Sequence, residues 1–288
     1  MDHVTANDVA FAYLTAGPED GPLALCLHGF PDSAHTWRHL APVLADAGHR
    51  VVAPFLRGYA PTAVPADGRY QTGALAKDAV ALHEALGGDE RAVIIGHDWG
   101  ATATYGAAAL APERWRRVVT AAVPPAGALA TGFTSYDQLR RSWYMFFFQH
   151  PLAEMVTPAD DLDFIDRLWQ DWSPGYDAGE DLELLKPSLR DPANLAAAIG
   201  YYRATLGTTA PDPALEAEQA ATRLPTPQPT LYLHGADDGC IGVELAEAAR
   251  PLLGEPGRVE IVPGAGHFLH LERPEVVNPM IVEFLASA

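Results

Sequence analysis

The sequence predicts an α/β fold in which helices cover a largely parallel central sheet. Short apolar runs recur about every 15 to 30 residues near both ends of the chain, and helix-forming stretches separate most of them. The chain has 288 residues, of which 48% are hydrophobic and 19% are charged. This composition allows a sizeable buried core and argues against disorder, so we expect one large globular domain or two small ones.

The runs expected to form strands are rich in β-branched residues and often end at glycine or proline. They are Val9–Tyr13, Leu23–Leu27, Arg50–Ala53, Ala92–Ile95, Val118–Ala122, Thr230–Leu233 and Val259–Val262. Parallel strands need long crossover connections, which are usually helical, so the stretches between most of these runs are expected to lie as helices on the sheet.

The alternation stops between about Pro124 and Pro225, where the sequence predicts helices interrupted by prolines. This part of the chain holds 13 of the 26 aromatic residues. We expect residues 124–225 to form an inserted helical subdomain, and residues 1–123 and 226–288 to form the core that contains the sheet. The aromatic rings either line a pocket or form the small core of the subdomain, and the sequence favours neither.

Charge and cysteine content exclude several classes of partner. Acidic residues outnumber basic ones by 37 to 19, for a formal net charge of -18, so nucleic acid and anionic membrane surfaces are poor partners. Cys26 and Cys240 show neither metal-binding spacing nor a disulfide pattern, which suits a reducing cytoplasm. No leader-like segment and no apolar stretch of roughly 18 residues is visible, so neither export nor membrane insertion is expected.

The strongest local signal is the pentapeptide Gly96-His97-Asp98-Trp99-Gly100, between the strand-like AVII and the helix-forming ATATYGAAALA. A strand, a tight turn and a helix in this order form a nucleophile elbow, in which a strained turn presents the central side chain. The glycines two positions before and after the centre prevent a steric clash. The central residue here is Asp98, whose alternative role is to cap the following helix.

Three further candidate residues follow later strand-like runs. Asp237 and Asp238 come after PTLYL, and His267 comes after VEIV. Catalytic groups in open α/β sheets gather at the carboxyl edge, so Asp98, the acid and His267 are expected to converge. Their chain order of nucleophile, acid and histidine is the one used with this elbow.

The loop His28-Gly29-Phe30-Pro31, after the run LALCL, is a candidate for backbone chemistry. The N–H groups of Phe30 and Trp99 can point at one oxygen and form an oxyanion hole. His28 is expected to be structural, and the Phe30–Pro31 bond is a candidate cis peptide.

The HGFP, GHDWG, GADD and GAGHF segments resemble those of α/β-hydrolases, and the likeness covers nearly the whole chain. It implies an α/β-hydrolase fold with a helical cap, and the spacing of three from Gly235 makes Asp238 the expected acid. An aspartate elbow followed by Trp99 is similar to the branch that contains epoxide hydrolases and haloalkane dehalogenases. The segments WYMFFFQ and GYYRA resemble the places where epoxide hydrolases carry paired ring-opening tyrosines, here Tyr144 and Tyr202.

The resemblance implies a cofactor-independent hydrolase that converts a small hydrophobic epoxide and water into a vicinal diol. Asp98, a carboxylate at neutral pH, attacks an epoxide carbon, and the two tyrosines hydrogen-bond and protonate the epoxide oxygen. His267, oriented by Asp238, then activates the water that hydrolyses the resulting ester. No metal is implied. The residues expected to contact the substrate are Trp99, Phe30, Phe148 and Phe268.

Two other functions stay open. A haloalkane or haloacid dehalogenase uses the same aspartate nucleophile, but Phe30 and Trp99 do not match its expected halide-binding and carboxylate-binding side chains. A non-catalytic ligand receptor on the same fold is the alternative from a different class. The sequence leaves open which epoxide is hydrolysed, with what regio- and enantioselectivity, and whether the protein is a monomer or a homodimer.

Overall fold

A computed structural model describes residues 1–207, 210–253 and 256–287. Within these ranges eight strands form one sheet in the order β1-β2-β4-β3-β5-β6-β7-β8. The strands are β1 (Asp2–Ala6), β2 (Val9–Ala16), β3 (Leu23–Leu27), β4 (Arg50–Pro54), β5 (Val93–His97), β6 (Arg117–Ala121), β7 (Thr230–Gly235) and β8 (Gly257–Val262). The pairs β1–β2 and β2–β4 are antiparallel, and all other neighbours are parallel. The predicted α/β class is therefore confirmed.

Each run expected to form a strand overlaps an observed one. β3 has the expected bounds, and β5 continues through His97, two residues beyond the expected end. The strand β1 was not expected from the sequence. Its residues DHVTA are mostly polar, it lies at the edge of the sheet, and only Ala6 of its five residues is buried. An edge strand of this kind needs no apolar run, so the hydrophobic pattern does not reveal it.

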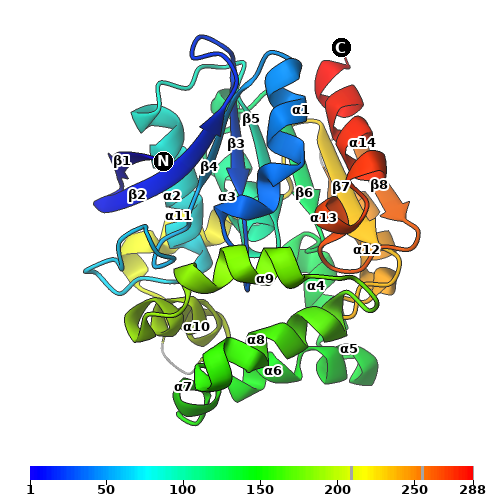
Figure 1. The fold of residues 1–288 in the computed structure, drawn as a ribbon. Coiled ribbons are helices and arrows are strands. Elements are labelled where there is room, and N and C mark those ends of the chain that lie inside the picture. Colours follow the sequence, from blue (N-terminus) through cyan, green and yellow to red (C-terminus); the bar gives the residue numbers. More distant parts are fainter. Residues whose placement is uncertain (208–209, 254–255, 288) are drawn as a thin grey trace.

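Helices flank both faces of the sheet. Those outside the connection between β6 and β7 are α1 (Leu40–Asp46), α2 (Thr72–Ala85), α3 (Trp99–Leu110), α12 (Val243–Ala249), α13 (Leu269–Glu272) and α14 (Pro274–Ala286). Contacts join α2 to α3 and α1 to α14, and the two pairs lie on opposite faces (Figure 1). Short 3-10 helices are η1 (Ala34–Arg38), η2 (Pro112–Arg114), η3 (Lys186–Ser188), η4 (Pro213–Leu215) and η5 (Arg250–Leu252).

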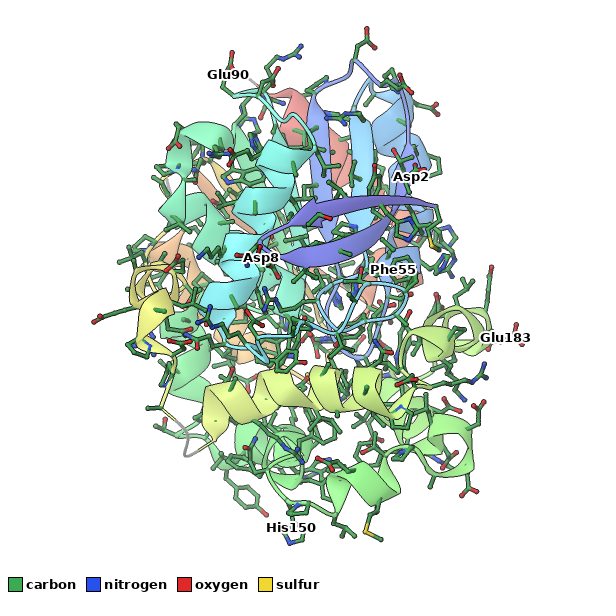
Figure 2. The ribbon with its side chains drawn as sticks, turned by 90° about the vertical axis from the view of Figure 1, so that its left-hand side faces the viewer. Asp2, Asp8, Phe55, Glu90, His150 and Glu183 are labelled. Carbon is green, nitrogen blue, oxygen red and sulfur yellow. The ribbon has the colours of Figure 1, made fainter. Side chains whose placement is uncertain are left out.

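The connection between β6 and β7, here called the helical segment, contains no strand within its described residues. Its helices are α4 (Ala126–Gly132), α5 (Tyr136–Arg141), α6 (Trp143–Phe147), α7 (Ala153–Val156), α8 (Ala159–Trp172), α9 (Gly179–Leu185), α10 (Pro192–Leu206) and α11 (Glu216–Ala221). The helix α11 packs on α2 and α3, whereas α4 to α10 lie over one end of the sheet (Figure 1). Figure 2 places His150 of this segment at the opposite end of the molecule from Glu90.

Buried apolar side chains of the sheet and of the helical segment form one continuous cluster among the described residues. The strands β3, β5 and β6 are buried along their whole length. Trp169, Trp172 and Tyr202 of the helical segment belong to the same cluster, so these rings pack against the sheet side of the protein as well as against one another. None of the helices in the described part of the chain is long and apolar enough to span a membrane.

A buried ion pair joins three parts of this architecture. Arg57, which follows β4 and is fully buried, donates from Nε and Nη2 to Asp78 of α2 at 2.5 and 2.7 Å. The Asn7 side chain also donates to Asp78, at 2.7 Å, and the hydroxyl of Tyr201 in α10 donates to the Arg57 carbonyl at 2.8 Å. The pair therefore ties the turn after β1, the helix α2 and the helical segment together.

Replacing Asp78 by alanine is expected to lower the free energy of unfolding by about 3 kcal/mol, because buried Arg57 would keep only the partly exposed Asp67, 3.7 Å away, as a charged partner. Urea denaturation followed by circular dichroism measures this change. Asp89→Ala is the matched control, since Asp89 pairs with Arg91 on the exposed surface and its loss should change stability little. Equal effects of the two substitutions would contradict a special role for the buried pair.

Candidate active site

The turn between β5 and α3 has the backbone of a nucleophile elbow. Asp98 adopts φ 53° and ψ -118°, in the left-handed region that residues other than glycine rarely occupy. A Cβ atom on Gly96 would lie 2.2 Å from the Gly100 carbonyl oxygen, and one on Gly100 would lie 2.1 Å from the Leu27 carbonyl oxygen. Both positions therefore need glycine, because α3 passes directly over the end of β5 and against β3.

The Asp98 side chain does not cap α3. It stands at the N-cap position but makes no capping hydrogen bond, and its Oδ1 accepts from the Phe30 N–H at 2.7 Å. Trp99, the first residue of α3, presents a backbone N–H that has no acceptor within the helix.

The loop after β3 has the features expected from its sequence. The peptide bond between Phe30 and Pro31 is cis. His28 Nε2 accepts a hydrogen bond from the Leu56 backbone N–H at 2.9 Å, so the His28 side chain has a structural contact.

Three side chains from three strand ends meet beside the elbow. Asp98 follows β5, Asp238 follows β7 and His267 follows β8. His267 Nδ1 lies 3.0 Å from Asp238 Oδ2, and His267 Nε2 lies 3.6 Å from Asp98 Oδ2. The backbone N–H groups of Cys240 and Ile241 donate to Asp238 Oδ1 at 2.7 and 2.9 Å. The other oxygen of Asp238 is thus left to face the histidine.

Asp237, the neighbouring carboxylate, is exposed at the surface, so the structure brings Asp238 and not Asp237 to His267. Burial opposes the charged form of His267, but Asp238 and Asp98 outweigh it and raise the imidazole pKa to about 10. Burial also opposes ionisation of Asp238. The charge of His267 and its hydrogen bond to Asp238 outweigh burial and keep the pKa of the Asp238 carboxyl group below its usual value. At neutral pH the His267 ring is therefore protonated on both nitrogens.

Two tyrosines of the helical segment lie opposite the elbow. Tyr144 comes from α6 and Tyr202 from α10, and their rings meet edge to face with centroids 5.5 Å apart. Burial raises the pKa of both phenols well above the usual value, and the nearby Asp98 carboxylate adds to the effect. The Tyr144 hydroxyl lies 3.4 Å from Cys240 Sγ. Both side chains are therefore neutral hydrogen-bond donors at physiological pH.

The two tyrosines and Asp98 line one cavity of about 40 Å³, which has room for two or three water molecules. Its lining residues are Asp98, Trp99, Thr102, Val123, Leu129, Phe133, Ser142, Tyr144, Met145, Tyr202 and Ile241. A larger neighbouring cavity of about 190 Å³ shares a wall with it, formed by Trp99, Thr102, Leu129, Phe133 and Met145. The two cavities therefore adjoin each other at these five residues.

Of the four aromatic residues expected to contact a substrate, only Trp99 lines this cavity. Phe30 and Phe148 lie behind it and pack on the Tyr202 ring, with centroids 5.2 and 5.1 Å away. Phe268 stacks on Trp169, with ring centroids 3.4 Å apart.

The aliphatic lining residues, such as Leu129, Met145 and Ile241, were not anticipated. Nothing in their local sequence separates them from ordinary core residues. The aromatic density of the helical segment indicated the region of a pocket but not the individual residues that line it.

Two clusters of described residues bring three metal-ligating side chains within 4.8 Å of one another. They are Asp238, Cys240 and His267, and Asp32, His97 and His270. In the first cluster the carboxylate and the imidazole already bond each other, which leaves little reason for a metal ion there. The second cluster lies behind the elbow.

Comparison with known proteins gives a consistent result. The sequence profile of the alpha/beta hydrolase fold matches residues 22–274. The chain is 30% identical to AB hydrolase superfamily protein YfhM of Bacillus subtilis, over 99% of its length and 97% of that protein. It is 31% identical to Epoxide hydrolase A of Mycobacterium tuberculosis, over 99% of its length and 96% of that protein. A solved structure of a candidate epoxide hydrolase from Klebsiella pneumoniae aligns with a TM-score of 0.88 at 27% identity, covering 99% of this chain and 97% of that one.

Asp98→Ala is expected to lower the pKa of His267 from about 10, because it removes one of the two carboxylates that hold the imidazole proton. In the unaltered protein the ring stays charged through neutral pH, and in the variant it loses its proton at a lower pH. A nuclear magnetic resonance titration of the ring nitrogens measures both values. Asp237→Ala, which removes an exposed carboxylate, should leave the titration unchanged, and an unshifted pKa in Asp98→Ala would refute the coupling.

Proposed function

The chain belongs to the α/β-hydrolase family, and we propose that it hydrolyses epoxides to vicinal diols through a covalent ester on Asp98. The observation that carries the proposal is the cavity shared by a carboxylate and two neutral phenols. A carboxylate can attack a saturated carbon without activation by a base, and an epoxide presents such a carbon next to an oxygen that two hydroxyl groups can hold. Relatives named epoxide hydrolase support the same reaction class.

In the first step Asp98 forms a C–O bond to an epoxide carbon while the carbon–oxygen bond of the ring breaks. The electron pair of the broken bond goes to the ring oxygen, which takes a proton from Tyr144 or Tyr202. The product is a hydroxyalkyl ester on Asp98 together with one tyrosinate. The low polarity around the two phenols favours their neutral form before the reaction, so a proton is available when the alkoxide develops.

In the second step His267 takes a proton from water, and the resulting hydroxide adds to the ester carbonyl carbon of Asp98. Esterification has removed the Asp98 charge, one of the two that raise the pKa of His267, so the ring gives up its proton, which restores the neutral tyrosine, and becomes a base. Asp238 keeps the ring oriented. The oxyanion of the tetrahedral intermediate is assigned to the N–H groups of Phe30 and Trp99, of which Phe30 already bonds Asp98 Oδ1. When the intermediate collapses, the bond between the Asp98 carbonyl carbon and the diol oxygen breaks, and the departing oxygen takes the proton held by His267. Asp98 then returns its own proton to His267 and is again a carboxylate.

Residues 124–225 act, in this proposal, as a cap over the core formed by residues 1–123 and 226–288. The cap supplies both tyrosines and keeps bulk water from the ester. In this proposal the 40 Å³ cavity takes the epoxide ring, and the apolar substituent extends into the 190 Å³ cavity. All of these groups come from one chain, so a monomer suffices. The cytoplasm is the proposed location, where the buried free thiols Cys26 and Cys240 stay reduced.

Dehalogenation is the second candidate because of one observation at Trp99. Its indole N–H is buried and lies close enough to the Tyr202 hydroxyl to act on the pKa of that phenol. An N–H of this kind beside the nucleophile can also stabilise a departing halide ion. The test of the proposed function therefore includes haloalkanes.

His267→Gln is expected to trap the ester, because ester formation does not need the base and hydrolysis does. Intact-mass spectrometry after incubation with pooled lipophilic epoxides should show a gain equal to one whole epoxide. The double variant Asp98→Ala with His267→Gln is the control and should gain nothing. A gain equal to an alkyl group without its halogen, from a haloalkane pool, would move the assignment to dehalogenation, and no adduct from either pool would contradict both.

Tyr144→Phe combined with Tyr202→Phe is expected to slow ester formation by about 10² to 10⁴-fold, since the epoxide oxygen loses its proton donors. Each single substitution should have a smaller effect. Rapid-quench mass spectrometry separates ester formation from ester hydrolysis. Tyr201→Phe is the matched control, because its hydroxyl donates to the Arg57 carbonyl and the residue does not line the cavity. Equal slowing of both steps in the double variant would point to a structural role of the tyrosines.

A further inference from the structure

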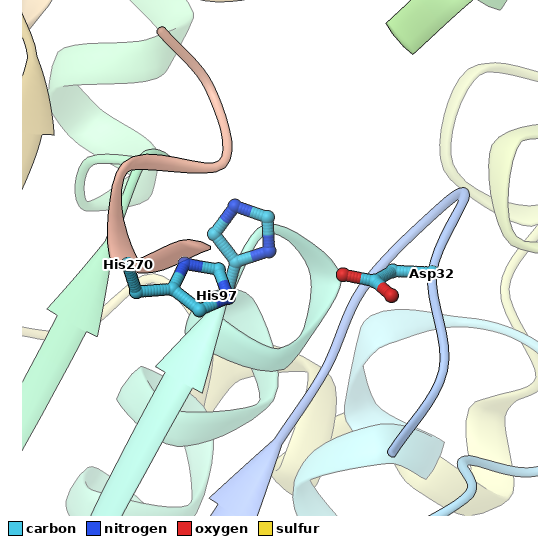
Figure 3. A group of neighbouring side chains, drawn as sticks. All are labelled: Asp32, His97 and His270. Carbon is cyan, nitrogen blue, oxygen red and sulfur yellow. The ribbon is translucent and has the colours of Figure 1, made fainter. Parts of the chain in front are cut away.

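A buried polar cluster lies directly behind the elbow. Asp32 comes from the loop after β3, His97 is the last residue of β5, and His270 belongs to α13. All three side chains are at most 3% exposed. Figure 3 shows the Asp32 carboxylate turned toward the two imidazole rings, and one ligand atom from each residue lies within 4.8 Å of the others. The proposed chemistry uses none of these side chains.

Each of the three side chains has one buried polar atom that meets no partner at hydrogen-bond distance among the described residues. The Thr36 hydroxyl also acts on the Asp32 carboxyl group and opposes the rise of its pKa. Asp32 Oδ1 accepts from a backbone N–H at 2.7 Å, His97 Nε2 lies 2.9 Å from the His267 carbonyl oxygen, and His270 Nε2 lies 2.6 Å from Thr36 Oγ1. The unpartnered atoms are Asp32 Oδ2, His97 Nδ1 and His270 Nδ1. Buried polar atoms are nearly always hydrogen-bonded, so three orphans in one place call for a common partner.

The proton on His97 can be assigned from its contacts. A carbonyl oxygen only accepts, so Nε2 carries the hydrogen that bonds the His267 carbonyl. Burial and the charge of His267 lower the pKa of His97 to about 3, so the ring is neutral and Nδ1 offers a lone pair. Burial raises the pKa of Asp32 to about 8, so at neutral pH this side chain is a carboxylic acid that can donate.

One water molecule satisfies this set of donors and acceptors. It accepts from the Asp32 carboxyl group and donates to the lone pair of His97 Nδ1, with His270 Nδ1 as its third partner. Two partners of one water lie about 4.5 Å apart when each hydrogen bond is near 2.8 Å and the angle at oxygen is tetrahedral. The three side chains are close enough for this, because one ligand atom from each lies within 4.8 Å of the others. Buried waters typically make about three hydrogen bonds of this kind.

We propose that Asp32, His97 and His270 hold one internal water molecule, and that this water makes His97 a positioning residue for His267. The His97 ring packs against the His267 ring with centroids 4.8 Å apart and bonds its carbonyl group. The orientation of His97 therefore determines where the loop carrying His267 lies. The second half of this proposal rests on the proposed function, and the first half does not.

The expected consequence is confined to one step of the reaction. Ester formation needs Asp98 and the tyrosines, whereas ester hydrolysis needs His267 aligned with a water molecule. A small displacement of a catalytic group slows its step by about 10- to 100-fold. Loss of the internal water should therefore slow hydrolysis and leave ester formation unchanged, a split that general destabilisation of the fold would not produce.

A crystal structure that resolves ordered water tests the site independently of any activity. The expected result is a single density peak about 2.7 to 3.2 Å from Asp32 Oδ2, His97 Nδ1 and His270 Nδ1. A peak about 2.0 to 2.2 Å from these atoms, with one equivalent of metal in elemental analysis of the purified protein, would replace the water by a metal ion and overturn the proposal. The absence of a peak would overturn it as well.

Substitutions of Asp32 test the positioning role. Asp32→Leu removes the donor to the water, whereas Asp32→Asn keeps an N–H donor at nearly the same place and serves as the matched rescue variant. In single-turnover mass spectrometry with an epoxide, Asp32→Leu should accumulate the Asp98 ester, with hydrolysis slowed about 10- to 100-fold and formation within about twofold. Asp32→Asn should hydrolyse the ester within about threefold of the unaltered protein.

Several outcomes would count against the positioning role. They are equal slowing of both steps, an unchanged rate of hydrolysis in Asp32→Leu, or failure of Asp32→Asn to restore hydrolysis. If Asp32→Leu does not fold, as circular dichroism would show, Asp32→Asn and the crystallographic test still decide. If the unaltered protein forms no ester with any epoxide, the proposed function fails, and the water site is judged by crystallography alone.

Discussion

The left-handed backbone of Asp98 is the constraint on which the rest of the site depends. A non-glycine residue in this region costs about 1 to 3 kcal/mol and persists only where its surroundings determine it. Here β5 is held between β3 and β6, and the glycines two positions before and after Asp98 let α3 begin immediately against β3. One turn thereby places the carboxylate at the sheet edge, beside the Phe30 N–H and the free N–H groups at the start of α3.

Burial determines the chemistry of the groups around this turn. The same low-polarity surroundings keep two phenols neutral and leave His267 charged because two carboxylates face it. The tyrosines come from the helical segment and the triad from the sheet edge, yet all of them belong to one continuous core. The geometry of the site is therefore a property of how the helical segment packs on the sheet, and of no single element.

Much of the fold was predictable because local patterns report burial. The seven apolar runs overlap seven strands, and the glycine spacing around Asp98 correctly predicted a turn that excludes side chains at both positions. The strand β1 was missed, since an exposed edge strand carries no apolar signature. The aliphatic residues that line the cavity were also not predicted, because their local sequence is like that of any buried segment and does not mark them as cavity residues.

By itself the sequence determined the class of fold, the strand ends that carry Asp98, Asp238 and His267, and the residue types available there. Spacing and periodicity encode these features because they depend on neighbours along the chain. The tertiary structure alone decided that Tyr144 reaches Cys240 and that Asp32, His97 and His270 meet behind the elbow. Such contacts join residues far apart in the chain, and their distances follow from the packing of the whole core, which no local pattern specifies.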